Sequence, residues 1–284
     1  MSFREKLEKN KFVYTVEVEP PKGVDIEKTL KKIIPLKEVI DAFNVTDMQS
    51  SVMRASSWAL AAKLKEMGLE PILQLTARDR NIIALQGDLL GCFMLGIKNL
   101  LLLTGDSPKK GDHPFAKEVF EVDSLGLIRI AQKLNEGFDW AGNKLKGETD
   151  FFIGAALNPL VEDQDKELKK MEEKIKAGAK FFQTQPIFDV DKFYQFMKKA
   201  EKFKTKIIAG IIFLKSYRVA NYLHEKVEGI YIPYNYRERI RKSKDVKEEA
   251  IKIAKEIITE LKDLTDGIHF MPLGCYEFLG EIIK

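Results

Sequence analysis

The sequence predicts a single (β/α)8 barrel, in which parallel strands alternate with helices around a closed sheet. Short apolar runs alternate with longer amphipathic runs along the whole chain. Several of the short runs are almost continuously hydrophobic, which is typical of strands that are buried on both faces. No linker or change in composition divides the 284 residues. We therefore expect residues 1–284 to form one domain.

The strands of this barrel are expected where the short apolar runs lie. They are Phe12–Glu19, Ala42–Asp47, Pro71–Ala77, Asn99–Asp106, Phe151–Asn158, Lys180–Gln185, Ile207–Leu214 and Gly267–Pro272. Gly229–Pro233 is a further apolar run. Because a short run that ends in proline makes a poor central strand, we assign it to the loop before the last helix.

Amphipathic segments between these strands predict the helices. They cover about 25–40, 52–68, 80–95, 123–135, 162–177, 190–203, 216–226 and 243–263. Asp25, Ser51, Asp123 and Asp189 are candidate N-caps. Pro108–Phe120 is long and irregular, as a ligand-binding loop would be. A doubly wound sheet is the main alternative, but it usually has fewer strands, and no GxGxxG follows the first strand here.

Composition excludes several classes of function. Lys and Arg number 47 against 43 Asp and Glu, and this weak excess of interleaved charge is not typical of a nucleic-acid binder. Two cysteines and three scattered histidines argue against a metal-dependent hydrolase, and we expect no metal site. The charged N-terminal segment has no apolar signal region, and no run spans a bilayer. We expect a cytoplasmic protein that does not bind a membrane.

Polar residues recur at the carboxyl ends of the expected strands, where barrels carry their sites. Together they predict a polar-lined cavity. They are Glu17, Glu19, Thr46, Asp47, Gln74, Thr76, Asp79, Arg80, Thr104, Gly105, Asp106, Asn158, Gln183, Gln185, Lys215 and Tyr217.

Glu17 is the most informative of these residues. It lies inside the apolar run Val13–Val18, and a carboxyl that is buried in a strand holds its proton more tightly, as suits a general acid near neutral pH. The alternative is that Glu17 and Glu19, two residues apart on one face, simply point into solvent.

The other strand-end motifs each leave two interpretations open. Thr104-Gly105-Asp106 is either a capping turn or a place where the backbone approaches a flat ligand closely beside a negative charge. The amides of Gln183 and Gln185 are costly in a buried strand unless they are hydrogen-bonded. Function and structure are equally good explanations for them.

Charged residues offer three more alternatives. Arg78-Asp79-Arg80 is either a phosphate clamp or a set of surface ion pairs, and Lys170 with Lys174 is either a solvated helix face or a pyrophosphate contact. Lys215 raises the possibility of a Schiff-base lyase. A reactive lysine should lie within an apolar strand, however, and Lys215 follows its strand.

Read together, these segments resemble the methylenetetrahydrofolate reductase family from about Lys11 to Met271. Any one motif is weak, but their order and spacing are specific. The motifs are VEVEPPKG (16–23), FNVTDMQ (43–49), PILQLTARDRN (71–81), LLLTGD (101–106), GAALNP (154–159), AGAKFFQTQPIFD (177–189) and AGIIFLKS (209–216).

The resemblance implies a flavin-containing barrel, mostly with FAD, that reduces 5,10-methylenetetrahydrofolate to 5-methyltetrahydrofolate. NADH or NADPH would first reduce the flavin, and the folate would then take the hydride at the same site. Glu17 matches the family's general acid, which protonates N10 so that the one-carbon unit becomes an electrophilic iminium. Asp106 matches an acidic residue near flavin and pterin, whose charge would favour that cation. Gln185 matches a residue that hydrogen-bonds the folate, and Tyr217 matches an aromatic that stacks on its aminobenzoate ring.

Cofactor contacts implied in the same way include Thr46 as a flavin contact and Lys174 as a basic contact to the flavin phosphates. Around them we also expect contacts from Gln74, Thr104, Gly105, Asp106 and Asn158. Gln74 stands where well-known bacterial members have His, Thr104 stands where they have Arg, and Glu173 replaces a second basic residue. The lost positive charge leaves FMN open beside FAD.

Two alternatives to the nicotinamide-dependent enzyme remain open at this point. The chain could be the folate-reducing subunit of a larger complex that receives electrons from a partner protein, or a Schiff-base lyase built on Lys215. For its assembly we expect a homo-oligomer or a complex with an electron-supplying partner subunit. Because the sequence ends soon after the last expected strand, we expect no regulation by S-adenosylmethionine.

Overall fold

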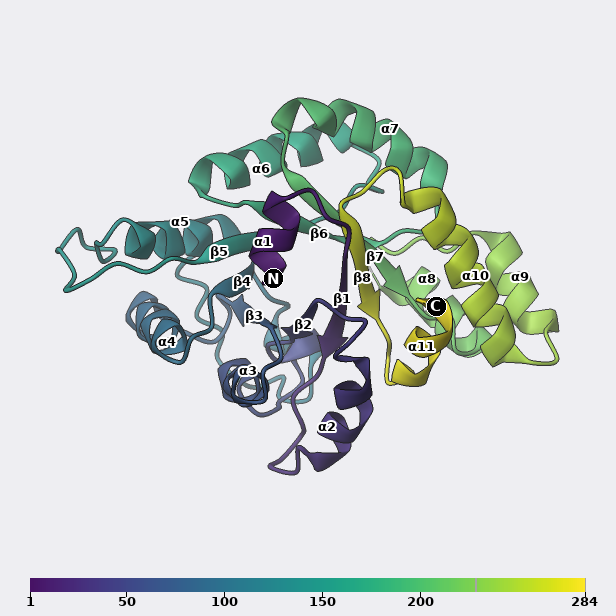
Figure 1. Cartoon of the computed structure of the whole chain (residues 1–284), viewed down its shortest axis with the longest axis horizontal. Coiled ribbons are helices and arrows are strands. Elements are labelled where there is room, and N and C mark those ends of the chain that lie inside the picture. Colours follow the sequence, from purple (N-terminus) through teal and green to yellow (C-terminus); the bar gives the residue numbers. More distant parts are fainter. Residues whose placement is uncertain (228, 284) are drawn as a thin grey trace.

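The computed structural model describes residues 1–227 and 229–283. Eight parallel strands close into a barrel in sequence order, with helices packed around it (Figure 1). The strands are β1 (Val13–Val18), β2 (Ala42–Val45), β3 (Pro71–Thr76), β4 (Asn99–Leu103), β5 (Phe152–Leu157), β6 (Phe181–Pro186), β7 (Lys206–Ile212) and β8 (Gly267–Met271). The predicted barrel is confirmed and the doubly wound sheet is wrong, because β1 pairs with both β2 and β8.

Most of the helices form the outer layer and bury their apolar faces against the strands, whereas α1 lies at one end of the barrel. They are α1 (Phe3–Glu8), α2 (Glu27–Ile33), α3 (Ser57–Glu66), α4 (Ile82–Met94), α5 (Ser124–Asn135), α6 (Gln164–Ala177), α7 (Val190–Ala200), α8 (Tyr217–Lys226), α9 (Tyr234–Lys242), α10 (Val246–Leu261) and α11 (Leu279–Ile282). Of the helices that the structure describes, none has the length and apolar character needed to cross a bilayer.

Several local expectations are corrected. Asp123 and Asp189 are N-caps, with side chains that accept from backbone N–H groups. Ser51 is not an N-cap, because α3 starts later, after Ser56. Asp25 misses the N-cap position by one residue, which Ile26 occupies.

The segment before the last long helix also differs from expectation. Residues 229–233 form no strand, as expected, but α9 follows them and separates them from α10. The sequence pattern had also given no indication of α1 or α11.

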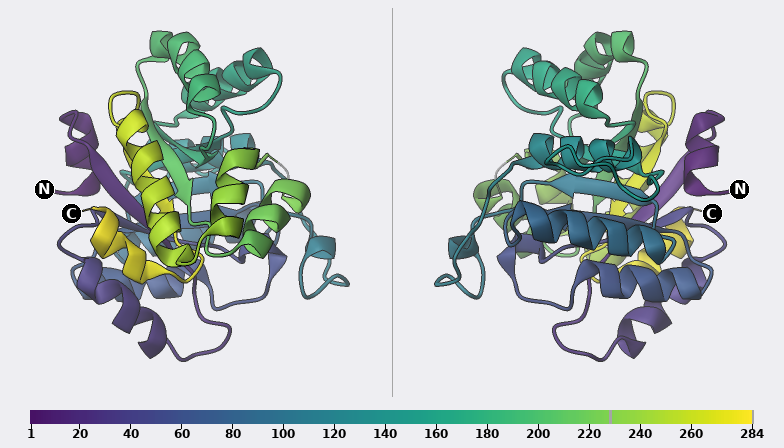
Figure 2. Two further views of the ribbon diagram at one scale, coloured as in Figure 1. Left: turned by 90° about the vertical axis from the view of Figure 1, so that its right-hand side faces the viewer. Right: turned by 90° about the vertical axis from the view of Figure 1, so that its left-hand side faces the viewer.

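Helix α1 closes the amino-terminal end of the barrel. Phe3 and Leu7 are buried in one apolar cluster with the first inward-facing residues of the strands. The Phe3 ring lies 5.3 Å from Phe181 and 6.1 Å from Phe152 in edge-on contacts. Figure 2 shows α1 standing beside the start of β1. Because this end is filled with apolar side chains, a polar site is left to the carboxyl end.

A layer of polar residues lies next to this apolar cluster, in the middle of the barrel. Thr15, Asn44, Gln183 and His269 are all buried there. They come from β1, β2, β6 and β8, and the strand register places Thr15 beside His269. Two of these residues, Gln183 and His269, also line the cavity of the candidate site.

Candidate active site

A cavity of about 220 Å³ opens at the carboxyl ends of the strands. Eight of the residues expected from the sequence line it. They belong to β1, β3 and β6 or to the loops that follow β2 and β4. They are Glu17, Asp47, Gln74, Thr76, Gly105, Asp106, Gln183 and Gln185. These eight strand-end residues therefore share one cavity, and their chemical roles stay predictions.

An irregularity in β6 brings extra polar groups to this cavity. Gln183 pairs with Ile208 but Pro186 pairs with Gly210, so β6 contains one extra residue between the two pairs. Such bulges break the alternation of inward and outward side chains. As a result Gln183, Thr184 and Gln185 all line the cavity, and the Thr184 hydroxyl accepts the Gly210 N–H at 2.9 Å.

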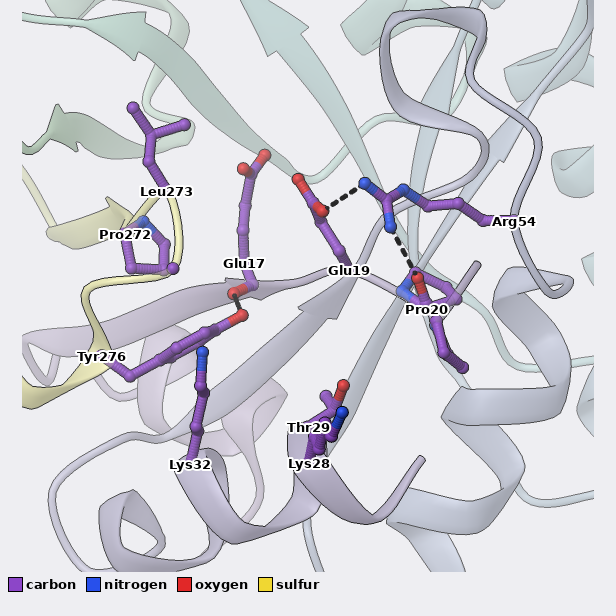
Figure 3. Close-up of a pocket in the computed structure, with 12 residues that line it drawn as sticks. Glu17, Glu19, Pro20, Lys28, Thr29, Lys32, Arg54, Pro272, Leu273 and Tyr276 are labelled. Carbon is purple, nitrogen blue, oxygen red and sulfur yellow. Dashed lines mark hydrogen bonds and ion pairs between the residues drawn. The ribbon is translucent and has the colours of Figure 1, made fainter. Parts of the chain in front are cut away.

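The Glu17 carboxyl is held at the cavity wall, with 13% of its side chain exposed. Gln49 Nε2 lies 3.4 Å from one carboxyl oxygen, and His269 Nε2 lies 3.7 Å from the other. The backbone carbonyl of Glu17 accepts the Tyr276 hydroxyl at 3.0 Å (Figure 3). Glu17 is thus partly enclosed, fixed through its backbone and approached by two polar side chains.

The polar layer below favours one tautomer of the neutral His269 ring. Gln183 Nε2 donates to Asn44 Oδ1 at 3.1 Å and to Thr15 Oγ1 at 3.3 Å. Since Thr15 Oγ1 accepts from Gln183, its own proton is available for His269 Nδ1, 2.9 Å away. In that arrangement the proton of the neutral ring is on Nε2, which faces Glu17.

Asp47 and the arginines after β3 are ion-paired with one another or with neighbouring residues, so they hold the loops in place and are not free to bind a ligand. The Asp47 carboxylate accepts the Thr76 N–H and hydroxyl at 2.9 Å each, and Arg80 binds it through two nitrogens at 2.9 and 3.2 Å. Arg78 is also buried and pairs with Asp79 at 2.6 Å. These arrangements favour ion pairs over a phosphate clamp.

The loop after β2 is strained where it borders the cavity. Met48, Ser50 and Ser51 have φ values of 50°, 54° and 57°, a left-handed conformation that costs energy in non-glycine residues. Arg78 Nη1 donates to Ser51 Oγ at 3.0 Å, which in turn donates to the Asp106 carbonyl at 2.7 Å. The neighbouring loops therefore hold this conformation in place and position Gln49 beside Glu17.

Gly105 and Asp106 form the rim after β4. Gly105 has φ +91°, and a β-carbon there would lie 3.1 Å from the β-carbons of both Thr76 and Arg78. Asp106 is half exposed, at 52% of its side chain, and lies 3.4 Å from Lys110 Nζ. Its carboxylate is the most accessible negative charge at this edge of the cavity.

The remaining expected site residues lie around the cavity rather than in its wall. Thr46 Oγ1 is buried and has no hydrogen-bond partner among the described residues. Thr104 Oγ1 accepts the Ser124 N–H at 3.0 Å, and the side-chain oxygen of Asn158 accepts the Leu160 N–H at 3.2 Å.

Lys174 and Tyr217 come from helices after β5 and β7. Lys174 Nζ donates to the carbonyl of Ala156, a cavity residue, at 2.9 Å, and burial lowers the pKa of this lysine. Tyr217 is 37% exposed and begins α8. Lys215 Nζ donates to the Leu273 carbonyl at 2.7 Å on an exposed edge, which is a poor setting for a Schiff-base lysine.

A second cavity of about 190 Å³ lies on the other side of Glu17, between the ends of β1 and β8 and helix α2. Glu19, Arg54 and Tyr276 line it together with Glu17 (Figure 3). Glu19 is paired with Arg54 at 2.7 Å, so the two neighbouring glutamates have different surroundings.

Sequence reasoning missed the residues that support Glu17. Thr15, Asn44 and His269 are polar residues within apolar strands, which was the available signal, but the three are scattered along the chain. Gln49 lies beyond its strand in a loop whose left-handed conformation no motif predicts. In the part of the chain that the structure describes, no group of three or more His, Cys, Asp or Glu side chains could hold a metal ion.

Comparison with known proteins identifies a single family. The family model for methylenetetrahydrofolate reductase matches residues 2–284. Methylenetetrahydrofolate reductase 2 of Saccharomyces cerevisiae is 28% identical over 74% of this chain and 34% of its own length. The 5,10-methylenetetrahydrofolate reductase of Pectobacterium carotovorum is 28% identical over 70% of this chain and 63% of its own length. The chain thus matches less than two thirds of either relative.

Solved structures support the fold. A protein from Clostridium thermocellum, described as binding two copies of 5-methyl-5,6,7,8-tetrahydrofolic acid, superposes with a TM-score of 0.69 at 15% identity, over 99% of this chain and 95% of its own. A 2,3-dimethylmalate lyase gives a TM-score of 0.55 at 13% identity, over 99% and 79% of the two chains. At these identities the likeness concerns the barrel alone. With the family model matching almost every residue, the chain belongs to the methylenetetrahydrofolate reductase family.

Proposed function

We propose that this protein reduces 5,10-methylenetetrahydrofolate to 5-methyltetrahydrofolate, with a flavin as cofactor and NADH or NADPH as electron donor. Residues 1–284 would form a single flavin-binding barrel. The observation that carries the proposal is Glu17, a partly enclosed carboxyl at the cavity wall with His269 and Gln49 beside it. The names of the relatives and the folate bound by the C. thermocellum protein agree with this substrate.

The reaction needs an acid at one defined atom. In the substrate, a methylene group bridges N5 and N10. Glu17 would give its proton to N10 as the methylene–N10 bond breaks, which leaves a cationic iminium at N5. A hydride then completes the methyl group. General acid catalysis of this kind is worth about 10²–10⁴-fold in rate.

His269 would position this acid. Its Nε2–H faces Glu17 because Thr15 and Gln183 fix the ring from below. The present 3.7 Å separation is long for a hydrogen bond, and such contacts often tighten only when substrate is bound. Once Glu17 has lost its proton, the Nε2–H would stabilise the carboxylate.

Asp106 would act on the substrate through its charge. The iminium is cationic, and a carboxylate at the rim lowers its energy. Gln185 would hydrogen-bond the pterin from the bulged strand. Tyr217 is assigned to the aminobenzoate ring on the family resemblance alone, since it is not among the described residues that line either cavity.

The residues present fit a flavin. A flavin ring carries both hydrogen-bond donors and acceptors, and the side-chain amides of Gln74 and Gln185 supply both kinds. Thr46 Oγ1, which lies just outside the cavity wall, has no hydrogen-bond partner among the described residues. Gly105 brings backbone to the cavity edge. When bound, a flavin supplies the group that accepts a hydride from the nicotinamide and passes it to the one-carbon unit.

Lys174 would contact the flavin phosphates, with Thr104 and Asn158 nearby. Its ammonium group has a carbonyl partner, and burial favours a strong interaction with an anion. FAD is the expected cofactor. FMN is the alternative, because Lys174 is the one basic residue expected at the flavin phosphates, and Glu173 stands where a second basic residue is common in the family.

The test follows both half-reactions in the purified full-length chain. The protein should bind FAD or FMN, lose flavin absorbance with NADH or NADPH, and regain it with methylenetetrahydrofolate as 5-methyltetrahydrofolate appears. A protein that binds neither flavin would contradict the cofactor assignment. If nicotinamides fail but chemically reduced protein still reduces the folate, electrons come from a partner protein instead.

A further inference from the structure

Gln49 contacts the proposed acid but has no step of its own in the proposed reaction. It lies in the loop after β2, lines the candidate active-site cavity and directs its side-chain nitrogen toward Glu17. We propose that Gln49 is a second positioning residue for this acid, whose amide stabilises the carboxylate that forms as the proton leaves. Contacts to neighbouring loops hold the amide in place. This inference rests on the proposed function.

The two oxygens of the Glu17 carboxyl have separate partners. His269 Nε2 lies 3.7 Å from Oε1, and Gln49 Nε2 lies 3.4 Å from Oε2. An amide nitrogen only donates, and a hydrogen bond to a carboxylate is stronger than one to a neutral acid. The Gln49 amide therefore contributes more after the proton has left than before. An interaction that strengthens in this way along the reaction lowers the barrier.

The backbone on both sides of Gln49 has an unfavourable conformation. Met48 has φ 50° and ψ 51°, and Ser50 has φ 54° and ψ 26°. Non-glycine residues keep this left-handed conformation only where the surrounding structure imposes it. The direction in which Gln49 leaves the chain thus depends on contacts that prevent the loop from relaxing.

Arg54 supplies three of these contacts and ties the loop to the segment after β1. Its backbone N–H donates to Met48 Sδ at 3.3 Å. Its guanidinium donates to the Pro20 carbonyl at 3.2 Å and pairs with Glu19 at 2.7 Å (Figure 3). Glu19 and Pro20 directly follow the strand that carries the acid. One side chain therefore fixes the loop relative to that strand.

The loop after β4 holds the same stretch of chain. Asp112 Oδ1 accepts the Met53 N–H at 2.9 Å. Gly111 packs so closely that a β-carbon there would lie 1.8 Å from the Ser51 carbonyl oxygen. None of these contacts involves the side chain of Gln49. They fix the backbone from which Gln49 reaches the acid, and they leave its amide free to act there.

Gln49→Met tests this role, because methionine has nearly the same length as glutamine but no N–H. The limiting rate of the folate half-reaction in stopped flow should fall about three- to tenfold, as expected for one long hydrogen bond to a carboxylate. Flavin reduction by the nicotinamide and the folate concentration that gives half the limiting rate should stay near wild type. Met53→Gln is the matched control. It makes the reverse exchange in the same loop, at an exposed side chain that lines neither cavity, and should keep both rates.

The double variant Glu17→Gln/Gln49→Met shows whether Gln49 acts through the acid. Without an ionisable group at position 17 the amide has no charge to stabilise, so the double variant should be no slower than Glu17→Gln alone. Losses that multiply would overturn the proposal, because Gln49 would then act on the substrate directly. Equal losses in both half-reactions of Gln49→Met would also overturn it, as would a loss that appears only as weaker folate binding.

A spectroscopic measurement keeps the test separate from the proposed reaction. In full-length protein labelled with ¹⁵N in its glutamine side chains, the signals that disappear in Gln49→Met identify the Gln49 amide. These signals should shift in Glu17→Met and stay in place in Glu27→Met, which removes an exposed glutamate that lines neither cavity. That result would support the contact even if methylenetetrahydrofolate were not turned over. Gln49 signals that do not move in Glu17→Met would refute the role even if turnover were normal.

Discussion

Replacing Thr15 by Val tests whether the buried polar layer positions Glu17. Valine keeps the shape of threonine but removes the hydroxyl that lies 2.9 Å from His269 Nδ1 and 3.3 Å from Gln183 Nε2. One acceptor on the ring and one donor on the amide are then buried without partners. Because each of these two groups costs about 1–3 kcal/mol, we expect the free energy of unfolding to fall by about 2–6 kcal/mol.

The same change should affect only one half-reaction. Without the Thr15 hydroxyl the His269 ring can carry its proton on either nitrogen, so Glu17 loses a defined N–H. Hydrogen bonds to charged groups contribute about 1.5–3 kcal/mol, which corresponds to a loss of about tenfold or more in the rate of folate reduction. Reduction of the flavin by the nicotinamide needs no acid from Glu17 and should keep its wild-type rate.

Anaerobic stopped-flow measurement of the two half-reactions, together with thermal unfolding, checks both expectations. Thr15→Ser is the matched control, because it restores the hydroxyl and should recover the folate half-reaction. If Thr15→Val reduces folate at the wild-type rate, or slows both half-reactions equally, the positioning role of His269 is wrong.

Three further changes test other parts of the structure. Gly105→Ala should lower stability by about 1–3 kcal/mol in chemical denaturation, since alanine is strained at φ +91° and crowds its neighbours; Gly91→Ala in α4 has open space and should not destabilise. Asp106→Asn should slow the folate half-reaction more than flavin reduction in stopped flow, and equal losses would mean that its role is structural. Phe3→Ala should cost about 3–5 kcal/mol in urea unfolding, because it empties the buried plug, and a loss below 1 kcal/mol would mean that α1 does not seal the barrel.

The strands of the barrel could be predicted because burial on both faces leaves a clear apolar run in the sequence. Each of the eight expected runs overlaps one strand of the barrel. The helices were less well defined at their ends, where caps and 3-10 turns decide the boundary. Helix α1 is too short, at six residues, for periodicity to reveal it, and it forms because Phe3 and Leu7 find partners inside the barrel.

The candidate site could be predicted where it follows from strand direction alone. Glu17, Gln74 and Asp106 lie at strand ends and therefore reach the same edge. The polar layer could not be predicted, because the contact between Thr15 and His269 depends on barrel closure between residues 254 positions apart. Nor could the bulge in β6, since a one-residue shift in pairing is set by the neighbouring strand rather than by a local motif.

The most direct test of the central claim is the rate at which methylenetetrahydrofolate reoxidises the reduced flavin in Glu17→Gln. Glu19→Gln is the control, because Glu19 lies just past the end of β1 and is paired with Arg54. We expect Glu17→Gln to bind flavin and accept electrons from the nicotinamide normally, while folate reduction falls about 10²–10⁴-fold. Glu19→Gln should lose far less. A Glu17→Gln protein that reduces folate at nearly the wild-type rate would contradict the role of Glu17 as the acid, and a larger loss in Glu19→Gln would transfer that role to Glu19.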